Sequence, residues 1–352
     1  MPQVVEINAI EHLESIRLRW TSLFYDTRGT SFFHTLDWLQ VYWQHHRDHQ
    51  RLKVLLVHRD GNVLGILPLV VRKERTDPGF AETLTYPMIH RQQFLGPIGR
   101  NPTATLIASL RFLARERRDW DILALPSIGE SDHGRTQNAM RLAEFQHNAA
   151  ADASIFKTSF AASRGSCILD AEPRLGEIHA TDERQTFTRI RSVGNNYGQE
   201  EALDGIANAC FELFKDSPAA STPPLSRGFF CAMIHTAHRL GMLDLNLLRD
   251  GKDLVAFAFN VHLNGELRQV CVGEYPSRFG TTAGQHLESR MLQDSITRRD
   301  KCFYGIARPE GSSGIGSTEK LPVVRYEHRE FIPLRVRLEQ LSRRLLSPLT
   351  RV

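Results

Sequence analysis

Residues 54–71 read Val54-Leu55-Leu56-Val57-His58-Arg59-Asp60-Gly61-Asn62-Val63-Leu64-Gly65-Ile66-Leu67-Pro68-Leu69-Val70-Val71, which is two apolar runs joined by an Asp-Gly turn. Glycine reaches positive φ without steric cost, so this pattern predicts a β-hairpin. A second stretch, residues 245–261, has the same form, with its turn at Asp250-Gly251. A single Asp-Gly hairpin is common, but two in similar surroundings indicate an internal duplication.

The segments around the two hairpins recur in one order. A Phe-Phe pair precedes each hairpin, at 32–33 and 229–230. After each hairpin, a segment with helical spacing of apolar residues ends in Arg-Arg-Asp, and a further apolar run follows at 122–125 and 302–306. The order predicts an α/β fold of two tandem units, each a mixed, largely antiparallel sheet flanked by helices. We place the first unit at residues 1–160 and the second at 161–333.

Composition fits two domains and sets aside several classes of protein. A chain of 352 residues with 41% hydrophobic content can bury two ordinary cores. The first residues lack a signal-peptide pattern and no apolar run is long enough to span a bilayer, so we expect a cytoplasmic protein. The five cysteines show no paired spacing, and the histidine pairs at 45/49 and 235/238 have no acidic third ligand nearby. We therefore expect no disulfide framework and no metal.

The formal net charge of +4 resides in residues 334–352, which hold five arginines against one glutamate. The balanced remainder gives no reason to expect a nucleic-acid partner. Leu334, Leu338, Leu341 and Leu345 share one helical face, so the segment predicts a basic amphipathic helix. Two interpretations remain open: the helix packs on its own domain, or it docks on an anionic membrane or a membrane protein at the inner face of the membrane.

A candidate anion site follows the third strand of the second unit. Glycines in the loop before the predicted helix 285–298 let the backbone approach a ligand closely, and the N–H groups and dipole of a helix N-terminus attract phosphate. The cofactor-binding residues predicted here are Arg278, Gly280, Thr282, Gly284 and Gln285. The corresponding loop of the first unit contains Pro102, which removes a donor, so we expect the first unit to be degenerate.

These features resemble the GNAT acetyltransferase superfamily, in particular the tandem-GNAT proteins called CelD/BcsL-like, which are related to the FemAB transferases. Residues 31–39, Ser-Phe-Phe-His-Thr-Leu-Asp-Trp-Leu, are similar to the opening segment of that family, and residues 60–69 to its first hairpin. Residues 282–287, Thr-Ala-Gly-Gln-His-Leu, are similar to its Ser-Pro-Gly-Thr-Leu-Leu stretch. Thr318-Glu319-Lys320 is similar to its Tyr-Lys segment.

The resemblance implies acyl transfer from a coenzyme A thioester, with acetyl-CoA as co-substrate, to an amine or hydroxyl without a covalent enzyme intermediate. The acceptor would be a small molecule or a cell-envelope or exopolysaccharide precursor. A base must take the acceptor's proton, and an acid can protonate the departing thiolate. Glu274 is the candidate base, and Tyr304 and Tyr275 are the candidate acids.

A glycine-rich loop, residues 311–316, could close on the acceptor, and the candidate acceptor-binding residues around it are Arg308, Glu310 and Lys320. The loop lacks the lysine of a Walker A motif, which argues against nucleotide hydrolysis. Two alternatives remain open. One is a FemAB-like transferase that uses aminoacyl-tRNA, and the other is a non-catalytic adaptor of a polysaccharide-synthesis system that docks through its basic tail.

Overall fold

The computed structural model describes residues 2–76, 79–90, 93–116, 118–160, 185–192, 200–215, 225–275, 282–306 and 317–329. The chain divides into two compact units, Met1–Ala153 with Pro322–Val352, and Ser154–Leu321. The first division falls inside strand β7 (Asn148–Ser159), close to the predicted boundary at residue 160. The return of the chain to the first unit within β13 (Ser317–Arg329) was not anticipated from the sequence.

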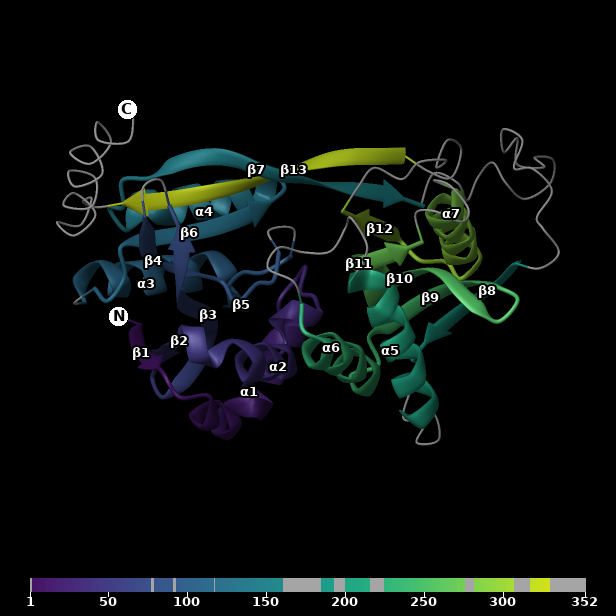
Figure 1. Cartoon of the computed structure of the whole chain (residues 1–352). Coiled ribbons are helices and arrows are strands. Elements are labelled where there is room, and N and C mark those ends of the chain that lie inside the picture. The colour runs from purple at the N-terminus through teal and green to yellow at the C-terminus, as the bar shows by residue number, and fades with distance from the viewer. Residues whose placement is uncertain are drawn as a thin grey trace, which may run out of the picture. The chain divides into compact units, whose positions relative to one another are not determined.

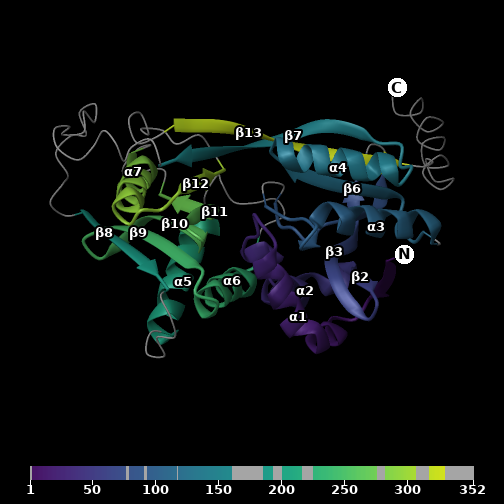
Figure 2. The same ribbon diagram turned by 180° about the vertical axis from the view of Figure 1, so that it is seen from behind.

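The first unit is a mixed sheet with strand order β1-β2-β3-β4-β6-β13-β7 (Figure 1). Helices α3 and α4 pack together on one face, where Leu106 and Met140 join a common core, and α1 and α2 lie on the other (Figure 2). The elements described before β7 are β1 (Gln3–Ile7), a 3-10 helix η1 (Ile10–Ile16), α1 (Arg17–Asp26), η2 (Phe32–His34), α2 (Leu36–His46), η3 (Arg47–His49), β2 (Gln50–Arg59), β3 (Asn62–Arg75), β4 (Phe80–Thr85), β5 (Ile98–Gly99), α3 (Pro102–Arg115), β6 (Ile122–Ile128) and α4 (Glu130–Leu142).

The strands described in the second unit have the order β7-β12-β11-β10-β9-β8. The remaining described elements are β8 (Gln185–Arg191), α5 (Glu200–Lys215), α6 (Arg227–Arg239), β9 (Leu243–Asp250), β10 (Asp253–Leu263), β11 (Glu266–Glu274), α7 (Thr282–Thr297) and β12 (Cys302–Gly305). Each unit contains one parallel pair of strands whose members are connected through a helix: β4 and β6 through α3, and β11 and β12 through α7. The first strand of each pair is also paired antiparallel with the strand before it. The two units therefore repeat one topology.

Both predicted hairpins are present. Strands β2 and β3 are joined with Arg59 opposite Asn62, and the two turn residues Asp60 and Gly61 have φ of 51° and 76°. Two consecutive residues with positive φ are typical of the type I′ turn, which matches the twist of the flanking strands. In the second hairpin Asp250 pairs with Asp253, and Gly251 has φ of 58°.

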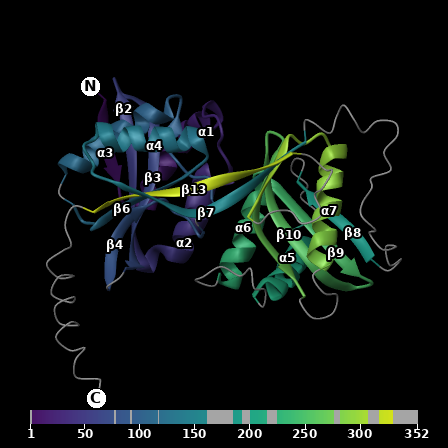
Figure 3. The same cartoon turned by 90° about the horizontal axis from the view of Figure 1, so that it is seen from above.

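Successive side chains of β10 point to opposite faces of the second-unit sheet, and most of them are buried. Both faces are therefore covered by helices. Ala256 and Ala258 face α7, where they share a core with Leu287. Phe257 points to the other face and meets the ring of Phe230 of α6 edge to face, with centroids 6.0 Å apart. Figure 3 shows α7 on one side of the strands and α5 and α6 on the other. The site at the end of β11 is built on this framework.

Candidate functional site

Strands β11 and β12 separate beside the predicted site. Their parallel ladder has three pairs, from Glu266 with Cys302 to Arg268 with Tyr304. Beyond Arg268, β11 continues to Glu274 with β10 as its neighbour, and among the described residues nothing pairs with it on the β12 side. The Ile306 N–H instead donates to the side-chain oxygen Oε1 of Gln269, at 2.9 Å. The sheet therefore opens at Gln269 and leaves a strand edge that leads to Glu274.

Glu274 caps helix α7. The Gly284 N–H, in the first turn of the helix, donates to Glu274 Oε2 at 2.9 Å. A carboxylate at a helix N-terminus is stabilised by the unpaired N–H groups and by the helix dipole. A Cβ at position 284 would lie 2.4 Å from Oε2, so only glycine permits this approach. Because a carboxylate has two oxygens, Oε1 is still available to accept a proton.

The cap bears on the predicted phosphate cradle. The Gly284 N–H, which we expected to face a phosphate, donates to a carboxylate, and a second anion beside it would be repelled. Thr282 is the first residue of α7, and Gln285 lies half-buried in its first turn. Arg278 and Gly280 lie outside the described residues, so the cradle as a whole stays a prediction.

The two candidate acids lie at different distances from Glu274. Tyr275 directly follows it, is 46% exposed, and is held by its backbone N–H to Val255 O at 3.2 Å. Tyr304 pairs with Arg268, which is six residues before Glu274 on β11 and hence about 20 Å away at 3.3 Å per residue. The strand register therefore places Tyr304 far from the carboxylate, whereas Tyr275 is the neighbour of Glu274 along the chain. Successive strand residues point to opposite faces, so the assignment of Tyr275 as the acid stays a prediction.

Tyr304 lies half-buried beneath Arg268, whose guanidinium carbon is 5.2 Å from the ring centroid. Burial raises the pKa of the Tyr304 phenol well above its usual value, with a further contribution from Cys302. A phenol with a raised pKa stays protonated and is a weaker acid. Tyr304 thus packs against Arg268, and its assignment as an acid stays a prediction.

The predicted acceptor-binding residues are only partly described. Lys320 is exposed on β13, in the segment where the Thr318 hydroxyl lies 3.1 Å from that of Thr158. Arg308 and Glu310 lie outside the described residues. Among the residues that are described, no group of three or more histidine, cysteine, aspartate or glutamate side chains could hold a metal ion. Likewise, no helix in the described part of the chain has the length and apolar character needed to cross a membrane.

A buried charged cluster, absent from the sequence-based prediction, anchors the other end of α7. Arg189 and Arg191 of β8 both reach Asp244 of β9, at 2.8 and 2.7 Å. Arg189 also pairs with Asp294 of α7 at 2.8 Å, and Arg191 with Asp300 at 2.8 Å. The Arg189 and Asp244 side chains are 2% and 0% exposed, so each charge depends on its partner.

Asp300 is held in its charged form by this cluster. Burial alone would raise the pKa of the Asp300 carboxyl, but hydrogen bonds from His262 and Arg191 outweigh that effect and hold the pKa far below its usual value. One sequence signal could have revealed the cluster. Asp244 and Asn246 alternate with leucines in an otherwise apolar strand, which places both polar groups on one buried face.

No protein-family model matches the chain, and a search of curated proteins finds no match. Solved structures do match in fold. FemX is 9% identical over 94% of this chain and 98% of its own, with a TM-score of 0.55. The C-terminal DUF2156 domain of a putative lysylphosphatidylglycerol synthetase from Agrobacterium fabrum is 9% identical over 96% of this chain and 98% of its own, also with a TM-score of 0.55. L-PGS from Bacillus licheniformis is 12% identical over 93% and 96%, with a TM-score of 0.52.

At these identities the likeness concerns the fold alone. It extends over nearly the whole length of both chains in each comparison, so it includes both units and not only one of them. Together with the repeated mixed sheet, it confirms the predicted fold class, an α/β fold of two tandem units, each a mixed sheet flanked by helices.

Proposed function

We propose that the protein is an acyltransferase whose active site lies in the second unit, where β11 ends beside the N-terminus of α7. The observation that carries this proposal is the open edge of β11 between Gln269 and Glu274. An unpaired strand edge offers N–H and C=O groups to an extended ligand that contains amides. The pantetheine arm of coenzyme A is such a ligand, and along this edge its thioester would approach Glu274.

In this mechanism Glu274 is the base. Its Oε2 is fixed by the Gly284 N–H, and its Oε1 accepts the proton as the acceptor amine or hydroxyl attacks the thioester carbonyl. The new C–N or C–O bond forms, the C–S bond breaks, and the thiolate leaves. Tyr275 is the proton donor for that thiolate, because it is exposed and directly follows the base. We expect acetyl-CoA as donor and a small molecule or glycan precursor as acceptor.

One observation favours a second candidate, transfer from aminoacyl-tRNA as in FemAB-like enzymes. The first-turn N–H of α7 that would contact a pyrophosphate is already bonded to a carboxylate. A donor without a pyrophosphate at this point would leave that bond intact. The acid–base chemistry at Glu274 and Tyr275 is the same for either donor, since both present an activated acyl carbon to a nucleophile.

Calorimetric titration of the full chain with acetyl-CoA tests the proposal. We expect saturable binding to the wild-type protein and to Glu274→Gln, which removes a negative charge near the ligand. A matched control is Glu319→Gln, at an exposed glutamate on β13. Absence of acetyl-CoA binding combined with transfer from charged tRNA would establish the second candidate. Absence of both would overturn the assignment as an acyltransferase and favour an adaptor.

A further inference from the structure

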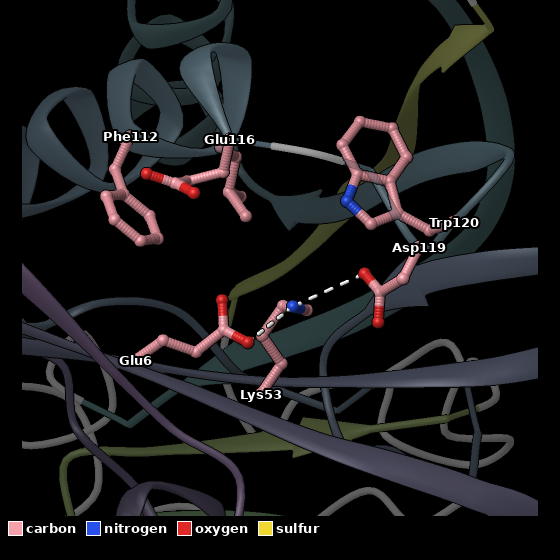
Figure 4. Close-up of a pocket in the computed structure, with 7 residues that line it drawn as sticks. Glu6, Lys53, Phe112, Glu116, Asp119 and Trp120 are labelled. Atoms are coloured by element: carbon pink, nitrogen blue, oxygen red, sulfur yellow. Dashed lines mark hydrogen bonds and ion pairs between the residues drawn. The ribbon is translucent and has the colours of Figure 1, made fainter.

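A separate cavity lies in the first unit, beside the C-terminal end of α3. Its volume is about 350 Å³, and it is bounded by β1, β2, the end of α3 and the segment before β6 (Figure 4). This volume is at the small end of the range for ligand pockets, so the cavity suits a small molecule. The side chains labelled in the figure are Glu6, Lys53, Phe112, Glu116, Asp119 and Trp120.

One wall of this cavity is formed by Lys53 and the two carboxylates that it pairs with, Glu6 and Asp119. Lys53 is 7% exposed, and its Nζ lies 2.6 Å from Glu6 Oε1 and 3.3 Å from Asp119 Oδ1. Asp119 is also 3.5 Å from Arg51 Nε. A buried ammonium between two carboxylates is satisfied by them, so Lys53 orders this wall and leaves no positive charge to attract an anion.

Two polar groups at the upper rim have no partner among the described residues. Glu116 follows the last turn of α3, is exposed, and makes no ion pair. Trp120 is 7% exposed as a residue, and its indole N–H has no acceptor among the described residues. Its nitrogen is not one of the fully buried unpartnered atoms, and Figure 4 shows it turned into the open space of the cavity, where a ligand can reach it. The cavity thus presents one free carboxylate and one free N–H donor.

The Trp120 ring is held in this orientation from the protein side. The Arg118 guanidinium carbon lies 5.0 Å from its centroid, and the Phe145 ring 6.4 Å away. Trp120 therefore does not need to reorganise to meet a ligand, which lowers the entropic cost of binding. Phe112 supplies an apolar wall across the cavity, suited to a short carbon skeleton.

We infer that this cavity binds a small amine that carries a hydroxyl or carbonyl oxygen next to its ammonium group. The ammonium pairs with the Glu116 carboxylate, the neighbouring oxygen accepts the Trp120 N–H, and the carbon skeleton packs on Phe112. An amino sugar and an α-amino amide both have this chemistry. The site lies wholly within the first unit, so it is independent of the proposed acyltransferase site.

Nuclear magnetic resonance of the full chain labelled with 15N-tryptophan tests the inference without any activity. The chain has four tryptophans, and Trp120→Phe identifies the indole signal of Trp120. Glucosamine and alaninamide are the probes, and the uncharged N-acetylglucosamine and lactamide are their matched controls. We expect a saturable shift of the Trp120 signal with one or both amines and none with the controls. A response to one amine only would identify the source as amino sugar or amino acid derivative.

Two variants separate binding from general effects. Glu116→Gln should weaken amine binding several-fold, because it removes the charge that pairs with the ammonium. Glu11→Gln, at another exposed glutamate of the first unit, should leave the titration unchanged. The inference is overturned if neither amine shifts the Trp120 signal, if the uncharged analogues shift it equally, or if Glu116→Gln binds as tightly as the wild type.

Discussion

At the scale of single residues, Gly284 and Glu274 depend on each other. The glycine has no side chain to obstruct the carboxylate, and the carboxylate satisfies an N–H that the helix leaves without a partner. The sequence indicated both residues as parts of a site, one as cradle and one as base. It could not indicate their hydrogen bond, because that bond depends on how the chain returns from β11 to α7.

Gly284→Ala should therefore destabilise the protein. The added Cβ would lie 2.4 Å from Glu274 Oε2, so the carboxylate must move and the cap is lost. Loss of the cap costs about 1 kcal/mol, and the higher helix propensity of alanine offsets part of that cost, so we expect a net decrease of about 0.5 kcal/mol in the free energy of unfolding, measured with urea. Gly205→Ala in α5 is the control, because nothing lies within 4 Å of a Cβ there, and it should stabilise by about 0.5–1 kcal/mol. Equal effects of the two substitutions would contradict the cap.

His46, in the first unit, gives a prediction for pH dependence. Burial lowers the pKa of the His46 imidazole to about 4, with smaller contributions from His45 and Arg72. A histidine with a depressed pKa contributes stability above its unfolded pKa near 6.5, and this stability is lost as pH falls toward 4. His46→Leu should make this loss of stability smaller by about 2 kcal/mol. Urea unfolding at a series of pH values between about 6.5 and 4 measures it. Gln44→Leu, on the exposed side of α2, should keep the wild-type slope.

At the scale of elements, local patterns were predicted well and edge strands were not. Both hairpins, α3, α7, β6, β11 and β12 lie where apolar periodicity and turn residues placed them. Strand β8 was missed because its alternation involves arginines, whose partners Asp244 and Asp300 are distant in sequence. Periodicity cannot identify a buried face that consists of charges, since the pattern looks like a solvent-exposed segment.

The charged cluster gives a prediction at this scale. Asp300→Asn removes one partner of Arg191 and leaves a buried guanidinium poorly compensated. We expect a loss of about 3–5 kcal/mol in the free energy of unfolding, because an uncompensated buried charge is costly. Asp48→Asn, whose side chain is 86% exposed, is the control and should change stability by less than about 0.5 kcal/mol. A similar small effect at Asp300 would mean that the cluster contributes little to holding β8.

At the scale of the whole molecule, the two units are assembled differently from the chain. The second is one continuous segment, Ser154–Leu321, whereas the first needs residues from both sides of it. The sequence predicted two units in order and could not reveal this return. Pairing of β13 with β6, Val323 opposite Ile128 through Arg329 opposite Ile122, depends on long-range contacts that local patterns do not encode.

Fragments of the chain should reflect this arrangement. Residues 154–321 alone should give a folded, soluble protein. Residues 1–153 should aggregate, because β6 loses its pairing with β13 while all of its residues are normally buried. Attaching residues 317–329 behind residue 160 through a Gly/Ser linker should restore solubility. Circular dichroism and gel filtration measure both outcomes. A soluble, folded fragment 1–153 would contradict the role assigned to β13.

The path of β13 also sets the order of events during synthesis. A chain leaves the ribosome from its N-terminus, and domains generally fold as their segments emerge. Here the segment that completes the first unit emerges only after the whole of the second. The N-terminal half must therefore wait, with an open strand edge, until translation has passed Leu321. The unit encoded first is the last to be finished, and its nascent form is the one we expect chaperones to protect.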